Sequence, residues 1–145
     1  MVKKEITYID FEGNKRTEEF YFNLTKAEFF KWTMTTGEYT IDKVLIRLAE
    51  EKNGKKIIEN FETLLKASYG KKSLDGRKFE KSEAIWQDFY QTEAYSTLFM
   101  DLITDGKKAA AFVNSLIPGD ASQDIEKILR ENKDGLPVAL RDYVN

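Results

Sequence analysis

The sequence predicts a single α+β domain that is mostly α-helical and carries an N-terminal β-hairpin. Two patterns predict this class. Residues 4 to 22 alternate loosely between apolar and polar positions around a glycine-containing turn, which is typical of a hairpin. Later segments space their apolar residues three and four apart, which is typical of amphipathic helices. A chain of 145 residues is long enough to bury one core without a disulfide or a metal.

The hairpin is expected over residues 3–22. Gly13 and Asn14 supply its turn, because both residue types tolerate positive φ. Its first strand carries two apolar residues on each face, Ile6 and Tyr8 on one and Ile9 and Phe11 on the other. An isolated hairpin is marginally stable, so it must pack on the helices or gain a strand. Its edge is open either to a strand from another subunit or to helices that cover it.

Helices are expected between residues 25 and 117, within a first region of residues 1–118. Thr25 and Glu28 have the spacing of a capping box, and Ser82 and Thr92 are expected to cap later helices. The apolar faces that define these helices comprise Ile41, Val44, Leu45 and Leu48; Ile57, Ile58, Phe61, Leu64 and Leu65; Ile85, Trp86 and Phe89; Tyr95, Leu98, Phe99, Leu102 and Ile103; and Phe112, Val113, Leu116 and Ile117.

Two further segments are assigned from their composition. Residues 70–81 are predicted to form a loop, because they are basic and contain the turn signal Asp75-Gly76. Gly70 is the expected stop of the preceding helix. Residues 119–145 are predicted to form a C-terminal helical extension, with Asp120 as an N-cap.

The charges are divided between two adjoining segments. Residues 54–81 hold eight basic and four acidic residues, a net charge of +4. Residues 82–106 hold no lysine or arginine but five carboxylates and five aromatic residues, a net charge of −5. The chain as a whole is only −2. Such polarity steers a protein onto a partner or onto another copy of itself.

The residue types that are absent exclude several chemistries. The chain has no histidine and no cysteine, which excludes zinc sites, cysteine nucleophiles and histidine triads. Asp101 and Asp105 lie four apart and share a helical face, yet no third ligand accompanies them. We therefore predict no catalytic residue, no cofactor and no metal. We predict no nucleic-acid partner, because the chain is net acidic and has no recognised binding module. We predict no membrane partner, because the chain has no apolar run long enough to span a bilayer.

Two residue sets are the candidates for binding. Trp86, Tyr90, Tyr95 and Phe99 are predicted to contact a partner, because aromatic residues are enriched in interface cores. Helical spacing favours a place in the core for Trp86, Phe89 and Phe99, whereas Tyr90 and Tyr95 are the expected exposed pair. The basic residues are predicted to serve self-association or to bind an acidic partner, and they are Lys71, Lys72, Arg77 and Lys78.

Several stretches together resemble a known family. They are Ile6 to Asn14, Phe20 to Glu28, Gly54 to Ile58, Ser68 to Ser73, Asp75 to Phe79, Gln91 to Met100 and Ala111 to Pro118. In this order they resemble the tail assembly chaperones of long-tailed, siphovirus-type phages and prophages of Gram-positive bacteria. The resemblance covers residues 3 to 118, and no single motif within it is diagnostic.

The resemblance implies a non-enzymatic role in the cytoplasm of the bacterial host. Family members bind the tape measure protein, keep it soluble, help the tail tube polymerise around it and are absent from the mature virion. Many are made in two lengths by a ribosomal frameshift, and this chain would be the shorter product. The adjoining charged segments suit head-to-tail contacts between copies, which give rings or open spirals. Two other readings stay open: a structural phage protein of the tail-completion or head–tail joining type, and a small carboxylate enzyme.

Overall fold

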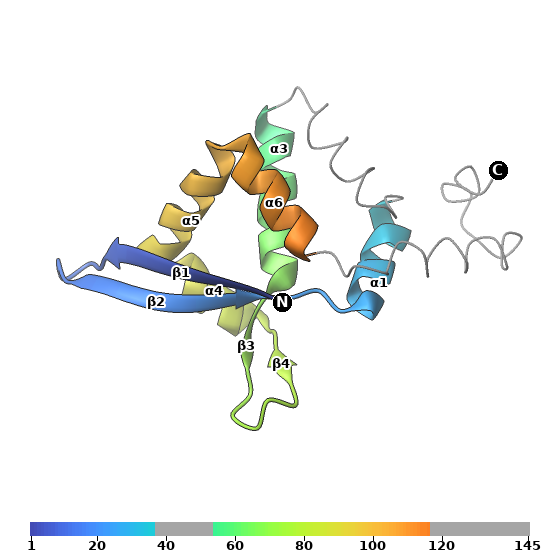
Figure 1. The fold of residues 1–145 in the computed structure, drawn as a ribbon, viewed down its shortest axis with the longest axis horizontal. Coiled ribbons are helices and arrows are strands. Elements are labelled where there is room, and N and C mark those ends of the chain that lie inside the picture. Colours follow the sequence, from blue (N-terminus) through green and yellow to red (C-terminus); the bar gives the residue numbers. More distant parts are fainter. Residues whose placement is uncertain (37–53, 117–145) are drawn as a thin grey trace, which may run out of the picture. The chain divides into compact units, whose positions relative to one another are not determined.

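The computed structural model describes residues 1–36 and 54–116 (Figure 1). Contacts divide the chain into two compact units. The first comprises Met1–Asn23 and Asn53–Leu116, and the second comprises Leu24–Lys52 and Ile117–Asn145. The helix predicted from Ile41 to Leu48 and the helical extension predicted at 119–145 lie outside the described residues.

The predicted α+β class is confirmed, since an N-terminal antiparallel hairpin is followed by helices. The described elements are, in order, β1 (Val2–Ile9), β2 (Lys15–Phe22), α1 (Lys26–Thr36), α3 (Gly54–Ser68), β3 (Tyr69–Lys72), β4 (Phe79–Glu80), α4 (Glu83–Tyr90), α5 (Glu93–Ile103) and α6 (Gly106–Leu116).

The strands form one four-stranded antiparallel sheet in the order β1-β2-β3-β4. β1 and β2 pair along their whole length, from Val2 opposite Phe22 to Ile9 opposite Lys15. β1 alternates as predicted, because Ile6 and Tyr8 are buried while Ile9 is exposed. The hairpin therefore uses one face of β1 for the core of the first unit and leaves the other face to solvent.

The loop predicted at 70–81 is wrong, because these residues build most of a second hairpin. β3 joins the outer edge of β2 through only two pairs, Phe22 with Tyr69 and Tyr21 with Gly70. β4 then pairs with β3, and only the turn between them is irregular. Strand alternation is absent from this segment because the two strands are short, and half of their residues, namely Lys71, Lys72 and Glu80, are exposed and charged.

Helix α3 also ends differently from the prediction. It stops at Ser68 and passes directly into β3, so Gly70 is a strand residue and not a helix stop. Ser68 is fully buried, and its hydroxyl donates to the carbonyls of Leu64 and Leu65 at 2.8 and 3.2 Å. The buried hydroxyl of Ser68 thus has hydrogen-bond acceptors within the last turn of α3.

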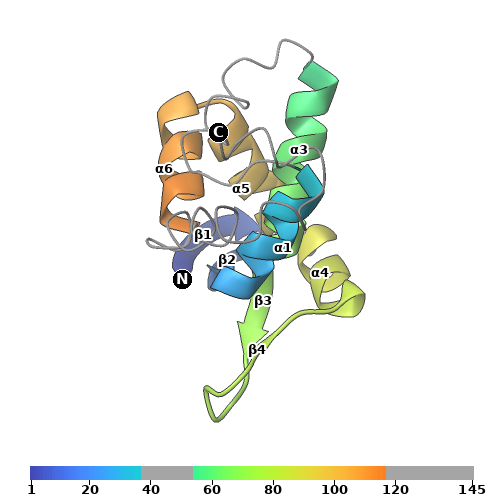
Figure 2. The same ribbon diagram turned by 90° about the vertical axis from the view of Figure 1, so that its right-hand side faces the viewer.

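The core of the first unit lies between the inner face of the sheet and four helices. α5 and α6 contact β1, and α4 contacts both β3 and α5. Figures 1 and 2 show α5 and α6 beside β1, on the side away from the β3–β4 turn. The fully buried large side chains of this unit are Phe22, Leu65, Phe89, Leu102 and Val113.

The predicted helix starts are confirmed. The Ser82 hydroxyl accepts from the Ile85 N–H at 3.1 Å at the start of α4. The Thr92 hydroxyl accepts from the Tyr95 N–H at the start of α5. In the second unit, Thr25 and Glu28 form the predicted capping box: the Thr25 N–H donates to the Glu28 carboxylate at 3.0 Å, and the Glu28 N–H donates to the Thr25 hydroxyl at 3.1 Å.

Candidate partner-binding surface

The four predicted partner-binding aromatic residues form a continuous row along α4 and α5. Ring centroids are 5.5 Å apart for Trp86 and Tyr90, 4.8 Å for Tyr90 and Tyr95, and 5.8 Å for Tyr95 and Phe99. These separations are typical of favourable aromatic contacts. The structure therefore brings the four side chains together, in a row that crosses from one helix to the next.

Exposure divides this row in two. Trp86 and Tyr95 are only 5% and 8% exposed, whereas Tyr90 is 40% exposed and Phe99 is half-buried. The expectation of an exposed tyrosine pair is thus confirmed for Tyr90 and wrong for Tyr95. The role of the four residues in partner binding stays a prediction, and Tyr90 is the most accessible of them.

Tyr95 is buried because a distant residue satisfies its hydroxyl. That hydroxyl donates to the Glu62 carboxylate of α3 at 2.9 Å. Burial raises the pKa of Tyr95, and the hydrogen bond to Glu62 raises it further. A neutral phenol that donates to a carboxylate can be buried at modest cost. The spacing of residues within α5 does not show that Tyr95 has such an acceptor.

Beneath the row, Phe89 connects the helices to the sheet. Its ring stacks on Tyr69 of β3 at 4.4 Å and lies 4.8 Å from Phe20 of β2. Burial raises the pKa of the Tyr69 phenol to about 12. The exposed Tyr90 ring therefore rests on a packed aromatic layer, so a partner would meet a surface with little freedom to rearrange.

The structure separates the four predicted basic residues into two pairs. Lys71 forms a 3.4 Å ion pair with Asp88 of α4, and the Lys72 ammonium lies 4.3 Å above the Tyr21 ring. Arg77 and Lys78 are exposed beyond them, and within the described part of the chain neither side chain forms an ion pair. The basic and acidic segments thus already meet within one molecule, and two cations are left at the turn.

The turn between β3 and β4 is held by its own hydrogen bonds. The Ser73 N–H donates to the Lys78 carbonyl at 2.9 Å, and the Ser73 hydroxyl donates to the Asp75 carboxylate at 2.7 Å. That hydroxyl, followed by the Arg77 N–H at 3.0 Å, lowers the pKa of Asp75. Gly76 supplies the required positive φ of 74°.

This turn exposes Leu74 completely. Figures 1 and 2 show the β3–β4 hairpin projecting from the rest of the first unit, with the turn at its far end. No pattern in the sequence singled out Leu74. The signal that was available is an apolar residue beside a turn motif, Leu74-Asp75-Gly76, in a basic segment.

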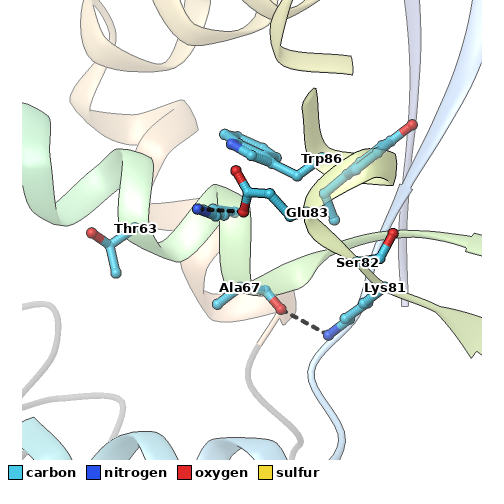
Figure 3. A pocket seen from close by; sticks show the side chains of 8 residues that line it. Thr63, Ala67, Lys81, Ser82, Glu83 and Trp86 are labelled. Atoms are coloured by element: carbon cyan, nitrogen blue, oxygen red, sulfur yellow. Dashed lines mark hydrogen bonds and ion pairs between the residues drawn. The ribbon is translucent and has the colours of Figure 1, made fainter. Parts of the chain in front are cut away.

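A pocket of about 430 Å³ lies at the other end of the same hairpin. Figure 3 shows Trp86 and Glu83 of α4 across from Thr63 and Ala67 of α3. The pocket is also lined by Lys66, Tyr69, Lys81 and Ser82. At its rim Lys66 pairs with Glu83 at 2.8 Å.

The Lys81 ammonium supports one side of this pocket. It donates to the backbone carbonyls of Asn23 and Ala67 at 2.7 and 2.8 Å, so it joins the end of β2 to α3. The pocket therefore combines an apolar lining with the exposed Lys66–Glu83 ion pair, and the Lys81 ammonium is bound to backbone carbonyls.

The two carboxylates that the sequence places four apart have separate structural partners. The Asp101 carboxylate accepts from Lys108 at 2.9 Å. The Asp105 carboxylate accepts from the backbone N–H groups of Lys107 and Lys108, which begins α6. Among residues 1–36 and 54–116, no group of three or more acidic side chains is arranged to hold a metal ion.

The chain matches a known protein family. Residues 1–138 match the family model described as phage tail assembly chaperone. The chain belongs to this family. A phage tail assembly chaperone acts in tail assembly, and the matched region reaches beyond residues 3–118, which carry the resemblance in the sequence. No curated protein and no solved structure matches the chain significantly.

Within residues 1–36 and 54–116, no helix of this tail assembly chaperone is long and apolar enough to cross a bilayer.

Proposed function

We propose that this chain binds the tape measure protein of a long-tailed phage of a Gram-positive host, and that it promotes assembly of the tail tube without catalysis. The family match over residues 1–138 carries this proposal. A tape measure protein made before its tube exposes apolar helical faces. A chaperone covers such faces with exposed apolar surface bordered by charge.

The first unit has the surface that this role needs. Large apolar side chains are exposed on the sheet, on both hairpin turns and on α4 and α5, namely Ile9, Phe11, Leu74, Tyr90 and Met100. A third of the residues of the chain are charged. These features support binding, because exposed apolar side chains gain the most from being covered by a partner.

We place the client contact on the row that Tyr90 and Phe99 expose. Trp86 and Tyr95 act from beneath, by fixing the two outer rings. Tyr90 supplies an apolar ring and a hydroxyl at low entropic cost, which is why tyrosine is favoured in interfaces.

The remaining parts of the proposal concern assembly. Many copies cover one long client, and copies associate head to tail into a ring or spiral. The tail tube protein is a second partner, met when the tube polymerises. The chaperone acts in the bacterial cytoplasm and leaves before the virion matures.

Co-expression with the tape measure protein tests the proposal. We expect the client to be soluble with this chain, to elute with it in a large complex, and to be insoluble without it. Tyr90→Ser should reduce the soluble fraction several-fold, because it removes the most exposed ring of the row. Ile58→Ser is the matched control, since Ile58 is exposed on α3, outside the row.

Two results would contradict the proposal. One is a client whose solubility is the same with and without the chain. The other is the chain in purified virions, which would support the tail-completion or head–tail joining role instead. Urea unfolding of both variants verifies that they stay folded.

A further inference from the structure

We propose that the pocket beside Trp86 receives a carboxylate side chain of the client, while apolar residues next to that carboxylate cover the aromatic row. We call this cavity of about 430 Å³ between α3 and α4 the Trp86 pocket. The contact rests on the proposed function, and it makes the bound client segment acidic as well as apolar.

The indole N–H of Trp86 is a buried donor that lacks an acceptor. The Trp86 side chain lines the pocket and is only 5% exposed, and within the described part of the chain its N–H donates to no acceptor. Figure 3 shows the indole nitrogen on the side of the ring nearer α3. A buried donor without a partner costs free energy, so nearly all such groups in proteins are hydrogen-bonded. A bound group that carries an acceptor oxygen would remove this cost.

The charges of the lining favour a negatively charged acceptor. The lining holds two lysines, Lys66 and Lys81, and one carboxylate, Glu83. The neutral backbone carbonyls of Asn23 and Ala67 hold the Lys81 ammonium in place at 2.7 and 2.8 Å. The lining residues therefore carry one more positive than negative charge, which favours a carboxylate over a neutral amide.

Lys66 can pair with an incoming carboxylate without leaving Glu83 unpartnered. The Lys66–Glu83 ion pair is exposed on both sides, so it costs little to rearrange. The other carboxylate oxygen of Glu83 accepts from the Gln87 amide at 3.1 Å, and that hydrogen bond does not involve the lysine. A client carboxylate would then accept from the Lys66 ammonium and from the Trp86 N–H together.

The position of the pocket favours the client as the source of this carboxylate. Trp86 is also the first ring of the aromatic row, and its centroid lies 5.5 Å from that of Tyr90. A client segment that covers Tyr90 therefore passes the pocket. Trp86, Tyr69 and Ala67 add apolar surface to the lining, which suits the methylene groups that carry a glutamate carboxylate.

NMR of the indole N–H groups tests the site on the full chain. The probes are short overlapping peptides that together cover the tape measure protein. The chain has two tryptophans, Trp32 and Trp86, so Trp86→Phe identifies the Trp86 signal by its loss. We expect the peptide that binds most tightly to contain an acidic residue beside apolar ones, and to move the Trp86 signal downfield.

Two substitutions separate the carboxylate from general binding. Replacing the acidic residue of that peptide with its amide should weaken binding about tenfold, because charge-assisted hydrogen bonds are stronger than neutral ones. Lys66→Gln should weaken binding of the acidic peptide and leave binding of the amide peptide unchanged. Lys107→Gln is the matched control, because Lys107 is an exposed lysine on α6, and it should bind both peptides as the wild type does.

Four results would overturn the proposal. They are equal binding of the acidic and amide peptides, a Lys66→Gln variant that binds like the control, a Trp86 signal that no peptide moves, and a Trp86 signal that moves with the concentration of the chain alone. The last result would assign the pocket to a second copy.

The co-expression assay keeps this failure distinct from a failure of the proposed function. If the client is soluble with the chain while its peptides leave the Trp86 signal in place, the proposed function stands and the carboxylate site is wrong. If the client is insoluble with and without the chain, the proposed function itself is wrong.

Discussion

The two hairpins of the sheet close their turns with the same device. In the β1–β2 turn, the Asp10 carboxylate accepts from the N–H groups two and four residues later at 2.9 and 2.8 Å, and Gly13 has a φ of 84°. In the β3–β4 turn, Asp75 accepts from the N–H group two residues later, and Gly76 has a φ of 74°. Each turn also exposes one large apolar side chain, Phe11 or Leu74.

The strands behind the turns differ. β1 and β2 have eight residues each and bury Ile6, Tyr8 and Phe22. β3 and β4 have four and two residues, and beyond Gly70 they bury none. Turn chemistry therefore closes a hairpin, but the burial of its strands decides whether it builds the core or projects from it.

Removing one aromatic ring from each hairpin is expected to give the largest difference between them in the free energy of unfolding. Phe22→Ala should lower the free energy of unfolding by about 3–5 kcal/mol, because Phe22 is fully buried and its loss leaves a cavity. Phe79→Ala should cost about 1 kcal/mol, because Phe79 is only half-buried. Urea unfolding measures both. Equal losses would mean that the β3–β4 hairpin belongs to the core as fully as β1–β2 does.

The two strands of the β3–β4 hairpin pack closely against each other at Gly70. A Cβ added at Gly70 would lie 2.6 Å from the Phe79 ring and 2.7 Å from the Glu80 carbonyl oxygen. Gly70→Ala should therefore cost about 1–3 kcal/mol through overpacking. Gly106→Ala is the control, since a Cβ there meets nothing within 4 Å. A Gly70→Ala variant as stable as its control would contradict the close approach of β3 and β4.

The two turn carboxylates should titrate differently in salt. Hydrogen bonds lower both pKa values below 3.8, from Arg16 above all for Asp10 and from Ser73 above all for Asp75. Their folded pKa values lie below the unfolded ones, so the stability they give is present above a pH of about 4 and is lost as the pH falls through the folded pKa.

Salt then distinguishes the two causes. In about 1 M salt the pKa of Asp10 should rise towards its ordinary value, because the cation of Arg16 is screened. The pKa of Asp75 should change little, because its donors are neutral. Carboxyl chemical shifts followed by NMR between pH 2 and 6 measure both, and a larger salt effect at Asp75 would reverse the assignment.

The smallest effect is expected at the tips of the turns. Leu74→Ser and Phe11→Ser should each change the free energy of unfolding by no more than about 0.5 kcal/mol, because both side chains are exposed. Thermal unfolding of both variants measures this. A loss above about 1 kcal/mol for Leu74→Ser would show that the side chain packs on its own unit, which would contradict its full exposure at the turn.

The same contrast explains how much of the fold could be predicted. The β1–β2 hairpin and the starts of α4 and α5 follow from local signals: alternation, a Gly-Asn turn, and capping by Ser82 and Thr92. The β3–β4 hairpin has only the turn signal. Its pairing with β2 depends on Tyr69 meeting Phe22, residues far apart in the sequence, and no local pattern carries that information.

The candidate surface was predictable to a similar extent. Helical spacing put Trp86 on one apolar helix face and Tyr95 and Phe99 on the next, but it could show neither that the four aromatic residues meet in one row nor which of them are exposed. Tyr95 is buried because Glu62, 33 residues earlier, accepts its hydroxyl. Likewise, the charge count identified the basic segment, but Asp88 and Tyr21 decide that Lys71 and Lys72 act within the molecule.

We propose that this tail assembly chaperone binds its client through surface that the fold leaves exposed, while its core stays unchanged. Hydrogen exchange of the chain with and without the tape measure protein tests this directly. We expect added protection in α4 and α5, around Tyr90 and Phe99, and unchanged exchange in β1 and β2. Protection that is absent throughout, or that spreads evenly over the first unit, would contradict the claim.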